Sequence, residues 1–360
     1  MIEGSRIKSL DGIRGGAALL VMGFHLVSTF GETAPQLLKK LSVIGQTGVD
    51  LFFVLSGFLI TGILLRTKGE PDYVRSFYVR RALRIFPLYF GFLTLHFFVI
   101  PGFLGESIAP FHTQVWSWVM MENVPQTFSS LPTSGPQHYW SLAVEEHFYL
   151  VWPWLVLWLS PARLARTVVG IIVLSPLIRF LMAQEGLGIY FFTLTRLDAI
   201  SMGAGLALLL HERDPSERIV VGVRSILVLL PTVLIPTFLL LSGSGAAWLQ
   251  AIKLSLIPAF YACFVFAVLR DGRFVHVRRL LSGKVVCWFG MISYGLYVFH
   301  PAVYRVAQTF LAAQPVELQV VCAVATSVLV AWLSYRFFEI HFLRAKKRVS
   351  FASRVVVQTP

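Results

Sequence analysis

Long apolar stretches alternate with short polar segments along most of the chain. An α-helix needs about 20 mostly apolar residues to cross the hydrocarbon core of a bilayer, and about ten stretches approach or exceed that length. They cover residues 13–30, 45–65, 85–103, 139–159, 167–183, 192–210, 225–241, 248–269, 286–311 and 317–340. The pattern therefore predicts an all-α, polytopic membrane protein with about ten transmembrane helices.

Composition agrees with this fold class. Hydrophobic residues make up 56% of the 360 residues and charged residues only 14%, and the mean hydropathy is +0.72. A soluble domain has about 25% charged residues, so this chain has too few polar side chains to cover itself in water. The first apolar stretch follows basic residues, as in a signal peptide, but Arg14 lies at its start and no small-residue cleavage site follows. We therefore expect a permanent first span.

The chain is strongly basic, with a net charge of +13. In a soluble protein such a charge would favour nucleic-acid binding. In a membrane protein, Lys and Arg concentrate in the cytoplasmic loops without any nucleic-acid partner. We therefore expect the lipid bilayer, and no nucleic acid, as a partner.

The basic residues gather in alternate connecting segments. Segments with a basic excess are 66–84, 270–284 and 344–354, and segments without Lys or Arg are 105–138 and 242–247. Only Lys39 and Lys40 break the alternation. Because basic loops stay in the cytoplasm, this distribution predicts that both termini are cytoplasmic.

No soluble module or internal repeat is apparent. We expect a single transmembrane domain over residues 1–345 and a disordered, basic cytoplasmic tail over residues 346–360. The three cysteines lie far apart in apolar stretches, without a CxxC or Cys/His cluster: Cys263, Cys287 and Cys322. This spacing predicts neither a disulfide framework nor a metal site, and no permanently bound cofactor is expected.

Ionisable side chains inside membrane spans are costly, so each one marks a candidate functional site. The predicted spans carry Arg14, His25, Asp50, Ser141, Glu145, Glu146, Arg196, Asp198 and His300. With the predicted orientation, His25, Asp50 and Glu145 lie in the outer half of the membrane. Arg14 lies near the cytoplasm, where a basic segment adds Arg80, Arg81 and Arg84.

These two groups of residues suit different chemical tasks. Histidine titrates near neutral pH and accepts a proton from a hydroxyl when a neighbouring group orients it. Guanidinium groups form paired hydrogen bonds with phosphate oxygens. The residues therefore indicate a phosphorylated ligand near the cytoplasm and a proton abstraction nearer the outside.

Six segments carry recognisable motifs. They read SLDGIRGGAALLVMGFH, GVDLFFVLSGFLIT, FYVRRALRIFPLYF, HYWSLAVEEHFYLVWP, TRLDAISMGAGLAL and ISYGLYVFHP. Together, in this order, they resemble the acyltransferase-3 family, whose members acylate O-antigens, exopolysaccharides, Nod factors and some macrolides. The resemblance runs from Ser9 to about Glu339. Many relatives have Ser and Gln where this chain has Ala143 and His147, a difference that bears on the choice of acceptor.

The resemblance implies an acyltransferase that uses acyl-CoA, most often acetyl-CoA, from the cytoplasm as co-substrate. It implies that His25 is the catalytic histidine, that Arg14 supports donor use and that Glu145 is the acid of the fourth span. The residues that would bind the CoA phosphates are Arg80, Arg81 and Arg84. We expect Asp50 or Glu145 to orient His25, which deprotonates the acceptor for direct transfer. A covalent acyl-histidine intermediate remains open.

The resemblance also places the reaction at the outer face of a bacterial inner membrane. The acceptor would be a hydroxyl of a glycan or of a glycosylated small molecule. Many relatives continue into an esterase-like domain after the last span, whereas this chain stops soon after it. Acceptor delivery would then fall to the membrane domain or to polysaccharide-assembly proteins.

Each candidate residue also has a structural interpretation. Asp50 can cap its helix, and His25 can be an ordinary core histidine. Arg196 and Asp198 can form an ion pair between helices. Because Pro301 follows His300 and frees a backbone carbonyl, a structural hydrogen bond competes with a catalytic role for this histidine. The remaining alternatives are positive-inside anchoring by Arg80, Arg81 and Arg84, and structural or acceptor contacts by Ser141 and Glu146.

Two other functions compete with acyl transfer. Polar residues at several depths in a ten-span bundle also suit a transporter. A non-catalytic partner of a polysaccharide synthase is the third possibility, and it predicts that His25 can be replaced without loss of function.

Overall fold

The computed structural model describes residues 7–212, 215–240 and 247–348, and all regular structure in these ranges is helical. The α-helices are α1 (Lys8–Phe30), α2 (Gln36–Ser42), α3 (Gly48–Thr67), α4 (Tyr73–Thr94), α5 (Ile100–Leu104), α6 (Phe111–Trp118), α7 (Asn123–Thr127), α8 (Trp140–Trp158), α9 (Pro161–Gln184), α10 (Leu197–Glu212), α11 (Glu217–Leu240), α12 (Ala247–Arg270), α13 (Val275–Leu281), α14 (Lys284–Phe310), α15 (Val316–Ser334) and α16 (Ile340–Arg348). Short 3₁₀ segments are η1 (Val43–Thr47), η3 (Gln137–Tyr139), η4 (Thr193–Thr195) and η5 (Gly272–Phe274), and π-helical segments are η2 (Leu95–Val99) and η6 (Tyr335–Glu339). The all-α prediction is confirmed.

Seven helical segments of the described ranges are long and apolar enough to cross a membrane. They are Lys8–Phe30, Gln36–Thr67, Tyr73–Leu104, Pro161–Gln184, Trp248–Arg270, Lys284–Phe310 and Val316–Lys346. The other three predicted spans correspond to α8, which carries two acids, to the shorter apolar α10, and to α11. The predicted span 225–241 ends at a residue outside the described ranges. The multi-span helical class is therefore confirmed, whereas the number ten and the orientation stay predictions.

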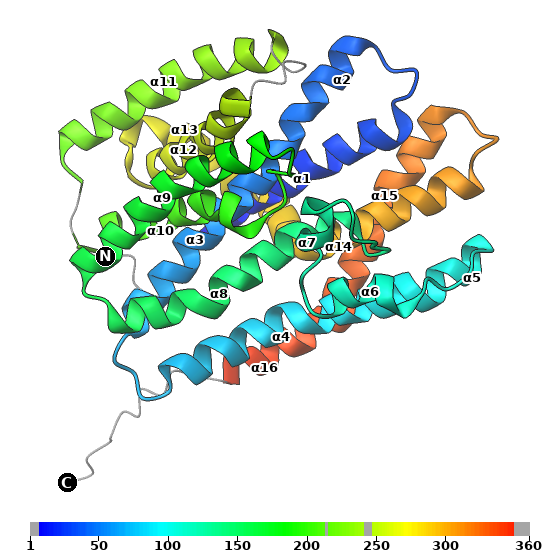
Figure 1. Cartoon of the computed structure of the whole chain (residues 1–360), viewed down its shortest axis with the longest axis horizontal. Coiled ribbons are helices and arrows are strands. Elements are labelled where there is room, and N and C mark those ends of the chain that lie inside the picture. Colours follow the sequence, from blue (N-terminus) through cyan, green and yellow to red (C-terminus); the bar gives the residue numbers. More distant parts are fainter. Residues whose placement is uncertain (1–6, 213–214, 241–246, 349–360) are drawn as a thin grey trace.

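The long helices run side by side across the bundle, with α4 and α16 along one edge and α11 along the opposite edge (Figure 1). The principal helix pairs are α1 with α14, α3 with α10, and α14 with α15. Most of the predicted tail, residues 349–360, lies outside the described ranges, and residues 346–348 continue α16.

Glycines set the closest helix contacts. A Cβ atom added to Gly57 of α3 would lie 1.9 Å from the carbonyl oxygen of Ile200, and one added to Gly203 of α10 would lie 1.9 Å from that of Val54. On the other main pair, a Cβ on Gly15 of α1 would lie 2.8 Å from the backbone nitrogen of Gly290 in α14. Small residues let membrane helices approach until their backbones touch. These contacts fix α1 against α14, and that pair carries the two histidines of the candidate site.

A compact segment of short helices connects α5 to α8 at one end of the bundle (Figure 1). Within this segment α6 occupies Phe111–Trp118. The carboxylate of Glu122 is fully buried and accepts hydrogen bonds from Ser117 at 2.6 Å and Thr133 at 2.8 Å. Burial raises the pKa of the Glu122 carboxyl, and its hydrogen bonds oppose that rise. A Cβ on Gly135 would lie 2.2 Å from Glu122 Oε2, so this carboxylate fixes the segment that runs along the candidate site.

Candidate active site

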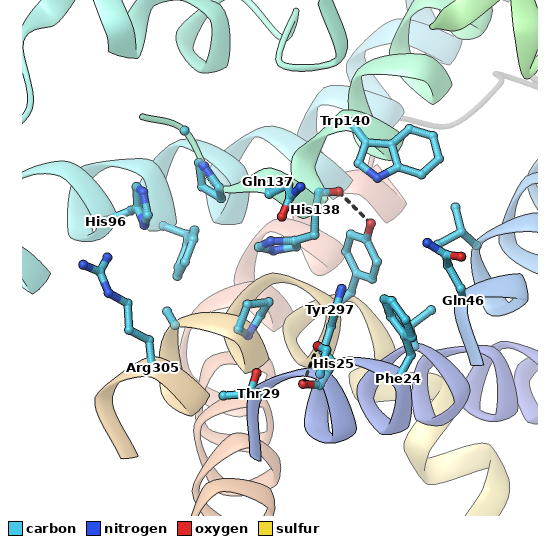
Figure 2. Close-up of a pocket in the computed structure, with 18 of the residues that line it drawn as sticks. Phe24, His25, Thr29, Gln46, His96, Gln137, His138, Trp140, Tyr297 and Arg305 are labelled. Atoms are coloured by element: carbon cyan, nitrogen blue, oxygen red, sulfur yellow. Dashed lines mark hydrogen bonds between the residues drawn. The ribbon is translucent and has the colours of Figure 1, made fainter. Parts of the chain in front are cut away.

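A cavity of about 570 Å³ lies between the connecting segment, α1 and α14, and we call it the histidine cavity. Figure 2 shows His25, His96 and His138 around it, together with Gln46 and Gln137. Its aromatic wall comprises Phe24, Phe92, Trp140, Tyr190, Phe191 and Tyr297. The cavity thus combines three histidines with neutral hydrogen-bonding groups and flat apolar surfaces.

His25 of α1 is paired with His300 of α14. The distance from His25 Nδ1 to His300 Nε2 is 2.7 Å, and the two rings stack with centroids 5.0 Å apart. His300 Nδ1 lies 2.7 Å from the carbonyl oxygen of Leu296. A carbonyl only accepts hydrogen bonds, so a neutral His300 carries its proton on Nδ1 and accepts through Nε2. His25 then donates from Nδ1, and its Nε2 keeps a free lone pair.

His138 joins the connecting segment to this pair. Its carbonyl accepts a 2.7 Å hydrogen bond from the Tyr297 hydroxyl (Figure 2), and its Nε2 lies 3.2 Å from the carbonyl of Val298. The Ser141 hydroxyl lies 2.5 Å from that of Tyr297. Since Ser141 is buried in this network, the structure gives it a partner within the protein.

A second group of polar residues lies around the first half of α4, and we call it the arginine cluster: Arg14, Arg80, Arg81, Arg84 and Lys346. Arg81 lies 3.8 Å above the ring of Tyr149 and 3.6 Å from Glu145, and Arg84 lies 3.9 Å from Glu339. Lys346 of α16 is within electrostatic range of all four arginines. Five basic side chains from three helices therefore converge on one region.

The two sites are joined by α1. Arg14 and His25 are eleven residues apart, which corresponds to about 16 Å at the helical rise of 1.5 Å per residue. The Arg14 guanidinium lies 3.4 Å from the Ser293 hydroxyl of α14, and His25 contacts the same helix through His300. One helix pair thus fixes the separation between the arginine cluster and the histidine cavity.

The predicted carboxylate partners of His25 lie against arginines. Asp50 accepts a 2.5 Å hydrogen bond from buried Arg196. Glu145 accepts from Tyr149 at 3.0 Å in addition to its contact with Arg81. The partner that the structure gives His25 is His300.

The expected pairing of Arg196 with Asp198 is not what the structure contains. Arg196 binds Asp50 and stacks 4.9 Å from the ring of Tyr190, whereas Asp198 lies 2.7 Å from Arg179 of α9. All of these charged side chains are buried. One ion pair joins α9 to α10, and the other joins α3 to Arg196, the residue immediately before α10. Each pair needs both partners because an unpaired buried charge is costly.

The sequence interpretation assigned no role to His96, His138 or Glu339. Glu339 lies at the end of the π-helical segment η6 and is buried beside Arg84. The sequence could have indicated a role for Glu339, because a single acid near the end of an apolar span is costly unless it is paired. Glu146, which follows Glu145 in the sequence, is partly buried, and its Oε1 atom has no hydrogen-bond partner within the described structure.

No group of three or more His, Cys, Asp or Glu residues in the described ranges is arranged to hold a metal ion. The groups that line the histidine cavity are suited to proton transfer and hydrogen bonding.

Comparison with known proteins connects this geometry to a reaction. A family model described as an acyltransferase domain matches residues 7–336. Peptidoglycan O-acetyltransferase OatA of Listeria monocytogenes is 28% identical over 356 residues, covering 92% of this chain and 55% of the relative. YrhL of Bacillus subtilis, a candidate peptidoglycan O-acetyltransferase, is 30% identical over 382 residues, covering 98% of this chain and 57% of the relative. The chain thus spans a little over half the length of these relatives, and no solved structure matches it.

Proposed function

The chain belongs to the acyltransferase-3 family, and from this premise we propose that it is an O-acetyltransferase of the bacterial inner membrane. The donor is acetyl-CoA from the cytoplasm, and the acceptor is a glycan hydroxyl at the outer face. The observation that carries the proposal is the His25–His300 pair. His25 lines the histidine cavity, at the opposite end of α1 from the arginine cluster, and the buried His300 contacts its Nδ1.

The proposed topology has ten spans and cytoplasmic termini. Seven helical segments qualify as spans, and α8, α10 and α11 would bring the number to ten. The arginine cluster, the start of α1 and α16 would then share the cytoplasmic face. This orientation agrees with the positive-inside rule.

The arginine cluster suits the CoA moiety, which carries a diphosphate and a further phosphate. Guanidinium groups bind phosphate oxygens through paired, charge-assisted hydrogen bonds. In this proposal Arg14, Arg80, Arg81 and Arg84 receive these phosphates, and Lys346 contributes a fifth positive charge. The pantetheine arm then extends along α1 and α14 toward His25, across a separation of about 16 Å along the helix.

The proposed chemical step uses His25 as general base. Its free Nε2 accepts the proton of the acceptor hydroxyl while the hydroxyl oxygen bonds to the thioester carbonyl carbon. Collapse of the tetrahedral intermediate breaks the carbon–sulfur bond, and the leaving thiolate takes the proton from His25. His300 holds the productive tautomer of His25, as the aspartate does in a serine-protease triad. Attack by His25 itself on the thioester is the alternative chemical route.

The proposed acceptor is a cell-wall or surface glycan. The names of both relatives refer to peptidoglycan, and the cavity offers Gln46, Gln137 and the ring of Trp140 to a sugar. Hydroxyl groups would hydrogen-bond with the amides, and a sugar face would pack against the indole. Asp50 and Glu145 support the site through the arginines that they bind.

Thiol release from acetyl-CoA tests the proposal. Purified protein in detergent is assayed with peptidoglycan-derived disaccharides and with envelope glycans, as wild type, His25→Ala and His112→Ala. His112 is an exposed histidine of the connecting segment and serves as the matched control. We expect acceptor-dependent thiol release by wild type and His112→Ala, and a loss of about 10²- to 10⁴-fold in His25→Ala.

Equal rates in His25→Ala and wild type would exclude His25 as the base. If wild type neither binds acetyl-CoA nor releases thiol with any acyl-CoA, the acyltransferase proposal fails and the transporter alternative takes its place.

A further inference from the structure

An apolar groove of about 450 Å³ lies next to the histidine cavity on the side of α4, α5, α14 and α15. We call it the lipid groove. Its lining is hydrocarbon and aromatic except for Cys322 and Thr326. Representative lining residues are Leu95, Phe103, Val306 and Phe310. Several of them are exposed on the face that the bilayer would cover.

The groove and the cavity share three residues: Phe92 of α4, Ile100 of α5 and Ala302 of α14. Within η2 the lining alternates, since His96 faces the cavity whereas Leu95 and Val99 face the groove. The cavity and the groove therefore adjoin each other, with these three shared residues between them. A single molecule with a polar part and an apolar part can occupy both.

A positive charge lies at the junction. Arg305 of α14 lines the cavity, and the next residue in sequence, Val306, lines the groove. Its guanidinium extends toward His96 in Figure 2. Arg305 pairs with Glu106 of the connecting segment, and their side chains are 52% and 42% exposed. Exposed pairs contribute little to stability, so a phosphate group can take the place of Glu106 on Arg305.

Arg305 lies midway along the groove. The lining extends from Phe299 of α14 to Leu311, the residue after this helix, so about 9 Å of chain length lies on either side of Arg305. Half of the hydrocarbon core of a bilayer is about 15 Å thick. The groove would therefore hold the part of a hydrocarbon chain nearest to Arg305, and the rest of the chain would lie among the bilayer lipids.

We propose that the acceptor is a saccharide linked through a phosphate to a long hydrocarbon chain. The sugar occupies the histidine cavity, the phosphate binds Arg305 and the chain lies in the lipid groove. This inference rests on the proposed function, because it names the class of acceptor for the same reaction. Its distinguishing requirement is that one acceptor molecule contacts His25, Arg305 and the groove together.

Binding is tested first, without reliance on catalysis. A disaccharide diphosphate carrying a prenyl chain with a photoreactive end group is irradiated with the protein in nanodiscs, and labelled peptides are identified by mass spectrometry. We expect labels in residues 95–103 and 303–311, and competition by the same compound without the photoreactive group. Equal labelling of all membrane-facing helices, or identical labelling by a prenyl alcohol without sugar and phosphate, would mean that the groove holds ordinary lipid and would overturn the proposal.

Kinetics then test the consequence for transfer. The acceptors are the free disaccharide, its methyl diphosphate and its prenyl diphosphate, each with acetyl-CoA. Tethering through a second contact raises the effective concentration of the sugar at the site, so we expect kcat/KM to rise at least about tenfold from the free to the prenyl-linked acceptor. No difference between these acceptors would refute the proposal even though acetyl transfer itself proceeds.

Two tryptophan substitutions separate the groove from general membrane effects. Val306→Trp fills the groove, whereas Val321→Trp places the same side chain on an exposed position of α15 that does not line it. We expect Val306→Trp to remove the advantage of the prenyl-linked acceptor, about tenfold, and Val321→Trp to keep it. If Val306→Trp instead changes only the preference among acetyl-, octanoyl- and palmitoyl-CoA, the groove holds the acyl chain of the donor and the proposal is wrong.

Discussion

The hydrogen-bonded chain from Leu296 through His300 to His25 yields the sharpest prediction. The His300 ring contacts the Leu296 carbonyl through Nδ1 and His25 through Nε2. Asparagine and glutamine at position 300 separate these two contacts. In His300→Asn, the short amide replaces the Nδ1 contact with the Leu296 carbonyl, which is 2.7 Å long, but stops short of His25. In His300→Gln, the longer amide places its oxygen near the position of Nε2, where it can accept the proton of His25 Nδ1.

The magnitude follows from the lost hydrogen bond. A buried hydrogen bond contributes about 1 kcal/mol, and 1.36 kcal/mol corresponds to a tenfold change in rate. Loss of tautomer control alone therefore lowers kcat roughly fivefold. Rotation of the freed His25 ring adds to this loss, and the limit is the full contribution of a general base, about 10²- to 10⁴-fold. We expect His300→Asn to lose between roughly fivefold and 10²-fold, and His300→Gln to stay within about threefold of wild type.

The assay is steady-state thiol release at saturating acetyl-CoA and acceptor, accompanied by the melting temperature of each variant. A double-mutant cycle with His25→Ala adds the decisive comparison. If His300 acts only through His25, the His300→Asn effect disappears once His25 is absent. Independent, additive losses would refute the dyad, and so would wild-type kcat in His300→Asn.

Three further predictions concern the fold and the arginine cluster. Gly57→Ala should lower the free energy of unfolding by about 1–3 kcal/mol because the added Cβ meets the Ile200 carbonyl. Gly170→Ala is the control, since there is open space around that position. Equal melting temperatures of the two variants would contradict the close contact at Gly57. Lys346→Met should raise the KM for acetyl-CoA several-fold with little change in kcat, and an unchanged KM would remove Lys346 from the donor site. Hydrogen bonds from Arg224 lower the pKa of Asp271, in the segment after α12, to about 2. The stability that the ionised Asp271 carboxylate contributes should therefore be complete above pH 3.8 and lost as the pH falls through about 2. The difference in melting temperature between wild type and Asp271→Asn should shrink over that interval. A difference that stays constant with pH would contradict this prediction.

Hydropathy and resemblance predicted the helical class and the polar residues that occupy the bundle, but not the partners of those residues. Asp50, Arg196 and Asp198 were each identified, yet Asp50 and Arg196 pair with each other and Asp198 pairs with Arg179. Pairing depends on the rotation of each helix about its axis. In helices that are apolar on all sides, periodicity carries little information about rotation.

His300 illustrates the same limit in another way. The sequence left open whether this histidine forms a structural hydrogen bond or takes part in chemistry, and Pro301 favoured the first interpretation. In the structure one ring nitrogen contacts the Leu296 carbonyl and the other contacts His25. The structural interpretation thus corresponds to the Nδ1 contact with Leu296, and the chemical interpretation corresponds to the Nε2 contact with His25. Only the packing of α1 against α14 brings His25 within reach.

Asp50 or Glu145 was expected to orient His25 because a carboxylate beside a histidine supports its uptake of a proton. Four buried or partly buried carboxylates lie beside arginines instead: Glu145 beside Arg81, Glu339 beside Arg84, Asp198 beside Arg179 and Asp50 beside Arg196. A buried carboxylate needs a positive partner or several hydrogen bonds, and the arginines meet that need. In the proposed mechanism, the neutral imidazole of His300 orients His25 without adding a negative charge to the membrane interior.

The two π-helical segments have a consequence for how the length of the gene can vary. A π-helical turn contains one residue more than an α-helical turn of the same extent. Deleting one codon within Tyr335–Glu339 would restore α-helical turns and leave α16 facing nearly as before, because the wider turn absorbs the extra residue. The same deletion inside α15 would rotate every downstream residue by about 100° and turn α16 away from Arg84. Comparisons of helix length among relatives should therefore allow one residue of variation at Tyr335–Glu339 more readily than within α15.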